Sequence, residues 1–178
     1  YCLTKDPLLA SWARKSHFGS VSDLEMSIKG VSINDQMPNF AFNRLEQVFG
    51  KLKNKKVVFL GISYRGDVGD TRFTPVEKLV EKVKDAGARI SLHDPYVSFW
   101  EEMDSSVESD LEAVLKSEPD LVILSTGHNQ YRKELTIKTL MNLKSTFIYD
   151  TIGLFDEKQL LTLQTRHKVN VLGRGDLI

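Results

Sequence analysis

The stretch KKVVFLGISYRGDVGDTRFTP, from Lys55 to Pro75, decides the fold. It opens with the apolar run 57–60, turns at Gly61, and continues through a loop with two further glycines and four charged residues before Thr74-Pro75 starts a helix. A strand, a glycine-bearing loop and a helix start together form the geometry by which α/β proteins hold phosphate groups. We therefore expect a strand here, followed directly by a loop that binds an anion.

The chain after Pro75 alternates short apolar runs with helical stretches. Candidate strands are 56–60, 89–93, 121–125, 146–149 and 169–172, and candidate helices are 75–86, 109–116, 135–143 and 156–165. Runs rich in Val and Ile that alternate with helices favour parallel strands joined by right-handed crossovers. The sequence thus predicts an α/β fold, a Rossmann-like parallel sheet with helices on both faces, preceded by a long helix.

Two helical patterns precede the sheet. Asp6-Pro7 is a good helix opening and predicts a short helix over 8–17. The longer pattern covers 22–50, where Ser22 and Glu25 have capping-box spacing and Pro38 should kink or divide the helix. This helix either covers the sheet or serves as an oligomerisation surface, and its pattern leaves both open.

Composition excludes several classes of protein. Hydrophobic residues make up 41% and charged residues 27% of the 178 positions, which is typical of a soluble globular protein. Acidic and basic residues balance at 24 each, so no overall field attracts nucleic acid or a membrane surface, and no apolar run is long enough to span a membrane. The single cysteine excludes an intramolecular disulfide and fits a reducing compartment, so we expect a cytoplasmic protein.

Polar residues follow each predicted strand. These sets are 61–65, His93-Asp94-Pro95, 125–128 and Asp150-Thr151. Because the carboxyl ends of parallel strands meet at one edge of a sheet, the four sets should converge on one rim. His93 and His128 could act as acid/base groups there, but rim histidines more often form hydrogen bonds to a neighbouring loop. Neither has a second ligand at metal-binding spacing, so we expect no metal site.

The loop after the first strand is not a dinucleotide fingerprint. It lacks G-x-G-x-x-G and the Lys-Ser/Thr ending of a P-loop. Backbone N–H groups freed by glycines remain, with Arg65 and Arg72 available to phosphate. Alternatively, Asp70 and Arg72 pair with each other or with the protein and hold the loop.

The only cysteine, Cys2, has two interpretations. A lone cysteine is often an inert small residue. However, Lys5 lies one helical turn away, and a neighbouring cation lowers a thiol pKa, while Asp6 could orient or deprotonate a water molecule. The second interpretation makes Cys2 a nucleophile.

Several motifs resemble one family, the UDP-glucose/GDP-mannose dehydrogenases, which are nucleotide-sugar 6-dehydrogenases. YCLTKDP at 1–7 resembles their catalytic-cysteine segment, and SINDQMP at 32–38 resembles their Asn-containing central helix. GISYRGDVGDTRFTP at 61–75 resembles the opening of their C-terminal UDP-binding domain, and HDP at 93–95 resembles the next strand end. GHNQY at 127–131 is more similar to the N-acetylhexosamine branch, such as UDP-N-acetylmannosamine dehydrogenases. The matches run in family order along the chain.

The resemblance implies a domain organisation. Such enzymes have an N-terminal NAD-binding domain, a central helical dimerisation region and a C-terminal UDP-binding domain. Residues 1–52 would hold the end of the central region with the catalytic cysteine, and residues 53–178 the UDP-sugar-binding domain. The chain starts at Tyr1 without Met, so we expect a fragment that lacks the NAD-binding domain and is inactive alone. It would bind a UDP-sugar and form a homodimer through the long helix.

The resemblance also implies a reaction, the NAD-dependent oxidation of the sugar C6 alcohol to a carboxylate. Cys2 would form a thiohemiacetal and then a thioester, and Asp6 would assist the water that hydrolyses the thioester. Substrate contacts would come from the cations and loop residues of the matching motifs, namely Lys5, Tyr64, Arg65, Asp70 and Arg72.

Four departures from the family pattern bear on the choice of sugar. Thr4 replaces a usual Pro, Arg65 a usual Lys, and Ile152 a usual basic residue. The basic residue of the central helix is shifted or absent, because Lys29 lies near its place and Val31 occupies one expected position. The alternative functions are a non-catalytic UDP-sugar-binding or regulatory module of the same fold, and an unrelated flavodoxin-like interaction domain.

Overall fold

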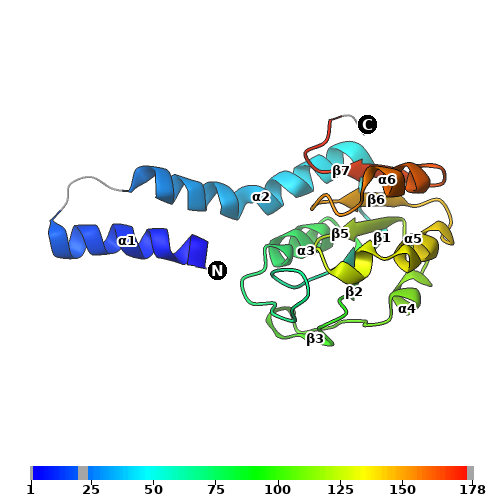
Figure 1. The fold of residues 1–178 in the computed structure, drawn as a ribbon, viewed down its shortest axis with the longest axis horizontal. Helices are drawn as coiled ribbons and strands as arrows, with labels where there is room; N and C mark the ends of the chain where they lie inside the picture. The colour runs from blue at the N-terminus through cyan, green and yellow to red at the C-terminus, as the bar shows by residue number, and fades with distance from the viewer. Residues whose placement is uncertain (1, 20–23, 176–178) are drawn as a thin grey trace.

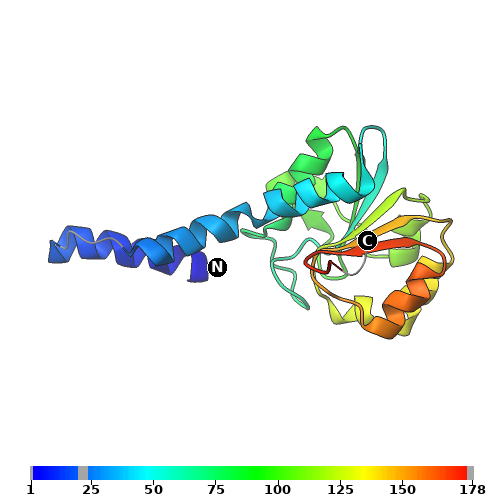
Figure 2. The same cartoon turned by 90° about the horizontal axis from the view of Figure 1, so that it is seen from above.

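A computed structural model describes the backbone at residues 2–19 and 24–175, and the side chains in these ranges except at positions 2, 3, 134 and 135. Two helices, α1 (Cys2–Phe18) and α2 (Glu25–Phe49), lie side by side and project from an α/β body (Figures 1 and 2). The far half of α2 joins this body. The long helix therefore belongs both to the projecting arm and to the sheet domain.

The body is built on a parallel sheet. Its strands are β1 (Lys56–Leu60), β2 (Arg89–His93), β5 (Leu121–Leu124), β6 (Phe147–Asp150) and β7 (Lys168–Val171), in the order β2-β1-β5-β6-β7. All five strands were predicted, with ends that differ by at most one residue. The chain leaves β1 toward β2 and returns on the other side to β5, so the topological switch point lies between β1 and β5.

Helices cover both faces of the sheet, as predicted. Val57 and Phe59 pack with α2 and with α3 (Val76–Asp85) on one face. Val58 and Leu60 pack on the other face, with the helices α4 (Leu111–Leu115), α5 (Glu134–Met141) and α6 (Glu157–Gln164). This alternation follows from the period of two along a strand. Because both faces are covered, the central strand β5 is apolar throughout and β1 is apolar after Lys56.

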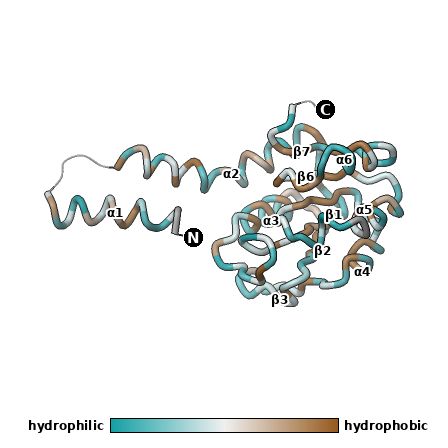
Figure 3. The backbone as a smooth tube through the Cα atoms, in the orientation of Figure 1, coloured by the Kyte–Doolittle hydropathy of each residue, from teal (hydrophilic) through white to brown (hydrophobic). Residues whose placement is uncertain are grey.

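The C-terminal half of α2 is fixed to the sheet. Ala41 and Leu45 are buried, and the Tyr149 hydroxyl donates a hydrogen bond of 2.9 Å to the Ala41 carbonyl. The N-terminal half keeps apolar side chains exposed, including Met26 and Ile33, and Phe40 just beyond the middle of the helix is exposed as well. Stretches of opposite hydropathy alternate along the arm (Figure 3). The C-terminal half of α2 therefore covers the sheet, and the N-terminal half presents exposed apolar side chains.

Both helices of the arm begin at other residues than the sequence predicted. Helix α1 begins at Cys2 and contains Pro7, whereas the sequence predicted a helix over 8–17 that opens at Asp6-Pro7. A proline within the second turn removes a single backbone hydrogen bond, and packing against α2 holds the helix across that position. Helix α2 begins at Glu25 after an N-cap at Leu24, and the predicted cap Ser22 lies outside the described residues.

Pro38 does not divide α2, because the helix continues through it from Glu25 to Phe49. Its ring is buried, and α2 packs against both α1 and α3, which holds the helix together where one bond is lost. Helix α2 ends before Gly50, which has φ +95° and caps it as the sequence indicated.

A small antiparallel pair was not predicted. It consists of β3 (Phe99–Trp100) and β4 (Ser105–Ser106), joined through the 3₁₀ helix η1 (Glu101–Met103). A second 3₁₀ helix, η2 (Asn129–Arg132), follows β5. Elements of two to four residues are too short to produce a readable hydrophobic period. None of the described helices combines the length and apolar character needed to cross a membrane.

Candidate functional site

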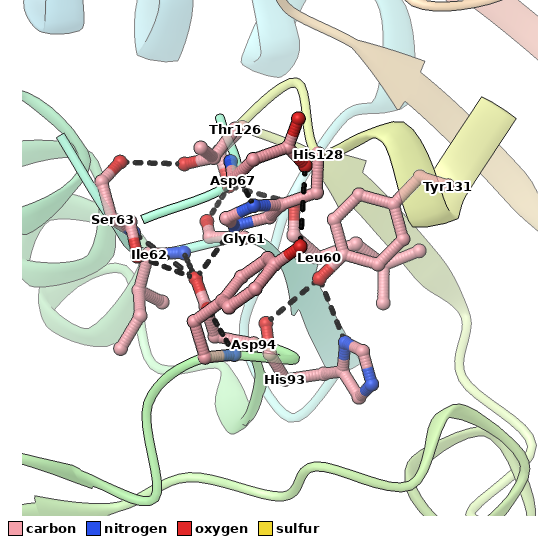
Figure 4. A network of polar contacts seen from close by, with 12 residues as sticks. Leu60, Gly61, Ile62, Ser63, Asp67, His93, Asp94, Thr126, His128 and Tyr131 are labelled. Atoms are coloured by element: carbon pink, nitrogen blue, oxygen red, sulfur yellow. Dashed lines mark hydrogen bonds and ion pairs between the residues drawn. The ribbon is translucent and has the colours of Figure 1, made fainter. Parts of the chain in front are cut away.

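The strand ends converge on one rim, as predicted, and the buried carboxylate of Asp94 joins them (Figure 4). Its Oδ2 accepts hydrogen bonds from the Ile62 amide at 2.9 Å, the Ser63 amide at 3.2 Å and the Ser63 hydroxyl at 2.9 Å. The fourth donor to Oδ2 is Nε2 of His128, at 2.9 Å. Asp94 thus connects the ends of β1, β2 and β5.

The hydrogen bonds decide the charge state of Asp94. Burial raises the pKa of this carboxyl group, but the bonds from His128, Ile62 and the Tyr96 amide outweigh burial and leave the pKa below its ordinary value. The carboxylate is therefore ionised at neutral pH although it has no solvent contact.

His128 forms hydrogen bonds from both ring nitrogens. Its Nδ1 lies 2.9 Å from the backbone nitrogen of Asp67, which is a donor. Nδ1 must therefore be the acceptor, and Nε2 carries the proton that reaches Asp94. The Asp67 carboxylate in turn accepts from the Asn129 amide at 2.9 Å. The hydrogen-bonding interpretation of His128 is confirmed.

His93 has a similar structural role. Its Nε2 lies 3.2 Å from the Ser109 carbonyl and donates to it, so Nδ1 accepts from the Tyr131 hydroxyl at 2.7 Å. Burial lowers the pKa of His93, which keeps the ring neutral. Among the side chains that the structure describes, no three His, Cys, Asp or Glu residues are grouped closely enough to hold a metal ion.

The last rim residue, Asp150, organises its own loop. Its carboxylate accepts hydrogen bonds from the amides of Ile152, Leu154 and Phe155 at 3.0, 2.6 and 3.4 Å. Burial raises the pKa of Asp150, and these backbone bonds oppose the rise. Asp150 therefore stabilises the turn after β6.

Glycines let the loop at 61–75, the glycine loop, lie directly on the rim. Gly61 has φ +92°, and a Cβ there would lie 2.5 Å from Cβ of Thr126. A Cβ on Gly66 would collide with the Gly127 carbonyl oxygen, and one on Gly69 would lie 2.6 Å from the Tyr96 carbonyl oxygen. The glycines therefore serve close packing of backbone on backbone.

The glycine loop was expected to form a phosphate-binding cradle of backbone N–H groups, and the structure does not show one. The amides of Ile62 and Ser63 bind Asp94, the Tyr64 amide binds the Asp70 carbonyl, and the Asp67 amide binds His128. These N–H groups are occupied by the protein itself and do not form an open cradle. Helix α3 begins only after Pro75, far along the chain from β1, so the loop does not fit a dinucleotide either.

A groove of about 530 Å³ lies between the helical arm and the α/β body. Helix α1 contributes Lys5, α2 contributes Asn34, and the glycine loop contributes Tyr64 and Phe73. Its other lining residues are Thr4, Leu8, Val31, Asp35, Pro38, Thr74, Pro75, Glu77, Lys78 and Glu81. The groove thus combines two lysines, three carboxylates and two aromatic rings.

The groove brings together two of the predicted site residues, Lys5 and Tyr64. Asp6 and Arg65 are exposed and are not part of the described lining. The side chain of Cys2 lies outside the described part of the chain, although its backbone begins α1.

Asp70 and Arg72 also lie outside the groove lining and pair with each other, which was the alternative interpretation. The Arg72 side chain lowers the pKa of Asp70 to about 2, chiefly through its hydrogen bond to the carboxylate. The pair is exposed to solvent on the glycine loop.

Sequence reasoning missed several residues around the site. Phe73 lines the groove with φ +58°, a left-handed conformation that a bulky side chain rarely adopts, and nothing in its identity signals this. The sequence predicted only that Lys78 lies in a helix over 75–86, without a role in a site. Asn34 could have been found, because it stands within the SINDQMP motif. A larger cavity of about 760 Å³ lies along the edge strand β2, but none of the predicted site residues lines it.

Known proteins resemble this chain in sequence and in fold. UDP-N-acetyl-D-mannosamine dehydrogenase from Methanocaldococcus jannaschii is 29% identical over 146 residues, covering 80% of this chain and 32% of the relative. NDP-N-acetyl-D-galactosaminuronic acid dehydrogenase from Methanosarcina mazei Go1 superposes with a TM-score of 0.80 at 25% identity, over 97% of this chain and 38% of that one. UDP-D-ManNAc dehydrogenase from Pyrococcus horikoshii gives 0.75 at 25% identity, over 98% and 38%.

The chain spans about a third of the length of the curated relatives that it matches. Residues 58–157 match the UDP-glucose/GDP-mannose dehydrogenase family, UDP binding domain. This match begins in β1, contains the glycine loop and the whole rim, and ends at the start of α6. The chain therefore belongs to the UDP-glucose/GDP-mannose dehydrogenase family and carries its UDP-binding domain.

Proposed function

We propose that this chain binds a UDP-sugar in the groove and is the substrate-binding part of an NAD-dependent nucleotide-sugar 6-dehydrogenase. The observation that carries the proposal is the composition of the groove. It joins Lys5 of the cysteine-bearing helix to Asn34 of α2 and to Tyr64 of the family's UDP-binding domain. These three segments are distant in sequence, and the fold brings them to one groove.

The groove has chemistry suited to both ends of a UDP-sugar. Lys5 and Lys78 offer cationic donors for a diphosphate, and the exposed Arg65 adjoins Tyr64 on the loop. Tyr64 and Phe73 offer aromatic faces to a base or a sugar ring. Carboxylates accept hydrogen bonds from sugar hydroxyls, and here they come from Asp35, Glu77 and Glu81.

The charge of Glu77 is adjusted by its neighbours. Burial raises the pKa of Glu77, and the nearby Glu81 and Glu102 raise it further. A ligand that brings hydroxyl donors into the groove would relieve this crowding of carboxylates, whereas a second anion would not. This favours placing the sugar, and not the diphosphate, beside the carboxylates of Glu77 and Glu81.

We assign the chemical role to the first turn of α1. Cys2, Lys5 and Asp6 are three and four positions apart, a spacing that places residues on one face of a helix. In the proposed reaction the C6 alcohol is oxidised to the aldehyde, the Cys2 thiolate adds to this aldehyde, and the resulting thiohemiacetal is oxidised to a thioester. Asp6 then assists the water that releases the carboxylate and returns the cysteine. NAD, when it is bound, would supply one hydride acceptor for each of the two oxidations. Because the glycine loop does not fit a dinucleotide, no part of the described chain is assigned to hold it.

The remaining elements of the proposal concern organisation. We assign residues 1–52 to the central helical region and 53–178 to the UDP-sugar-binding domain, although the C-terminal half of α2 packs into the core of the latter. We further assign the exposed apolar face of the arm to a homodimer contact.

Calorimetric titration of the chain with UDP, UDP-glucose, UDP-N-acetylglucosamine and UDP-N-acetylmannosamine tests the proposal. We expect at least one UDP-sugar to bind. Lys5→Ala should weaken binding about tenfold, as for a lost hydrogen bond to a charged group, and Tyr64→Ala should weaken it by a similar factor because an aromatic contact is lost. Lys158→Ala, an exposed lysine of α6 away from the groove, is the matched control. Absence of UDP and UDP-sugar binding at millimolar concentration would refute the proposal.

A further inference from the structure

Both ends of the short segment that carries Tyr64 and Arg65 are tied to the rim (Figure 4). Before the segment, the amides of Ile62 and Ser63 bind Asp94. After it, the Asp67 amide binds Nδ1 of His128. Residues 64–66 lie between the two attachments, and the Tyr64 amide also binds the Asp70 carbonyl at 2.7 Å. The two attachments therefore help to set the position of Tyr64 beside the groove.

His128 couples the two attachments. Its Nε2 donates to the same Asp94 oxygen that holds Ile62 and Ser63, while its Nδ1 accepts from Asp67. Only the neutral imidazole with the proton on Nε2 can do both. A proton on Nδ1 would place an N–H group against the N–H group of Asp67 and break that bond.

The surroundings leave His128 little freedom. The ring has no solvent exposure, and the rings of Tyr96 and Tyr131 lie 5.2 and 5.4 Å from it, centre to centre. The Tyr131 hydroxyl is directed to His93, so it does not compete for Nδ1. The Asp67 carboxylate is engaged by Asn129. The groups that face His128 are therefore Asp94, Asp67, Tyr96, Tyr131 and, more distantly, His93.

We propose that His128, as the neutral Nε2–H imidazole, is a positioning residue that holds Tyr64 and Arg65 for the ligand by linking Asp94 to the Asp67 amide. The inference rests on the proposed function, because it assigns a UDP-sugar to the groove that Tyr64 lines. It extends that function by identifying a residue that never contacts the ligand yet sets its affinity.

Two substitutions separate positioning from simple structural support. His128→Gln places an amide donor where Nε2 was and keeps the bond to Asp94, but removes the acceptor for Asp67. His128→Asn places an amide oxygen where Nδ1 was and keeps the bond from Asp67, but removes the donor to Asp94. Each variant therefore retains one of the two attachments.

We expect the Gln variant to bind the UDP-sugar about tenfold more weakly, with faster hydrogen exchange at the Asp67 amide and unchanged exchange in β5. Compared with His128→Gln, we expect His128→Asn to lose more of the free energy of unfolding but to keep more of the affinity for the UDP-sugar. A merely structural histidine would make affinity and stability fall together in both variants, and that result would overturn the proposal.

A spectroscopic measurement on the unaltered protein tests the proposal without any substitution. In ¹⁵N-histidine NMR, Nδ1 of His128 should appear as an unprotonated acceptor and Nε2 as protonated at neutral pH. The opposite tautomer would overturn the proposal.

A milder substitution tests the same link. Asn129→Ala changes an exposed residue and removes only a side-chain contact to Asp67, so it should weaken binding of the UDP-sugar by a smaller factor than His128→Gln does. If Asn129→Ala and His128→Gln both bind normally, the proposal is wrong.

Failure of the proposed function would give a different result. In that case the unaltered chain binds no UDP-sugar, while the tautomer of His128 and the exchange at Asp67 still report whether the loop is held as inferred.

Discussion

The guanidinium group of Arg72 binds both carboxylate oxygens of Asp70, with Nε 2.9 Å from Oδ1 and Nη2 2.9 Å from Oδ2. The Asp70 carboxylate also accepts from the Arg72 amide at 3.2 Å, so the pair closes a tight turn of the glycine loop. Both side chains are exposed, by 45% for Asp70 and 75% for Arg72. The pair therefore shapes the loop and remains accessible to a ligand.

Removing the guanidinium should restore ordinary titration of Asp70. Its pKa is lowered to about 2, chiefly by the hydrogen bond from the Arg72 side chain, so Arg72→Gln should raise it toward the usual value of about 3.9. Because the folded-state pKa is depressed, the contribution of the pair is present above pH ~4 and is lost as pH falls toward 2. NMR titration of the Asp70 carboxyl carbon measures this shift.

Arg89→Gln is the control for that titration, since Arg89 is exposed and its side chain donates to the Asn54 carbonyl. Asp70 should titrate in this variant as in the unaltered protein. If Asp70 keeps its low pKa in Arg72→Gln, the cause assigned to the shift is wrong.

Gly61→Ala should destabilise the protein by about 2 kcal/mol or more, because φ is +92° and the new Cβ would lie 2.5 Å from Thr126. Gly30→Ala is a control that should change the free energy of unfolding in the opposite direction. Gly30 lies within α2 with open space around it, so the alanine should stabilise the chain by about 1 kcal/mol. Urea unfolding of both variants gives the comparison, and equal free energies of unfolding for Gly61→Ala and the unaltered chain would contradict it.

The sequence predicted the sheet well because its signal is local. Runs such as Leu121–Leu124 are apolar throughout and bounded by turn residues, so the strand and its burial can be read from a few neighbouring positions. The convergence of the strand ends follows from parallel pairing alone. Residues at 93–94 and 125–128 were therefore placed correctly on one rim.

The contacts on that rim were not predictable in the same way. Asp94 and His128 are 34 positions apart, and Asp67 and His128 are 61 apart, so no local pattern pairs them. Nor does the sequence say that the loop amides bind the protein itself instead of an anion. The start of α1 was misplaced because the helix is stabilised across Pro7 by packing against α2, and that tertiary contact overrides the local signal.

Asp94→Asn should cost about 3 kcal/mol at pH 7, because one amide cannot replace a carboxylate that accepts on both oxygens. The folded-state pKa of Asp94 is lowered, so the carboxylate stabilises the fold above its unfolded value of about 3.9 and this stabilisation is lost as pH falls below that. Unfolding at pH 7 and below pH ~4 should show a large difference between the variant and the unaltered chain that shrinks in acid.

Asp120→Asn is a suitable control for Asp94→Asn, since Asp120 also has a lowered pKa but is partly exposed and binds Lys55 and the Lys56 amide. Its substitution should cost about 1 kcal/mol or less at pH 7. A cost for Asp94→Asn no greater than this would show that the buried carboxylate does not hold the rim together.

The arm should mediate self-association with a second copy of this chain. Ile33 and Phe40 are 54% and 57% exposed and share one face of α2 by their spacing, and exposed apolar residues that share a helix face are typical of an interface. Sedimentation equilibrium should give a dimer, and Phe40→Glu should shift it toward monomer because a charge would be buried in the contact. Leu161→Glu makes the same change at a 62% exposed leucine of α6 and should leave the dimer intact. A monomer in the unaltered chain, with and without UDP-sugar, would rule out this interface.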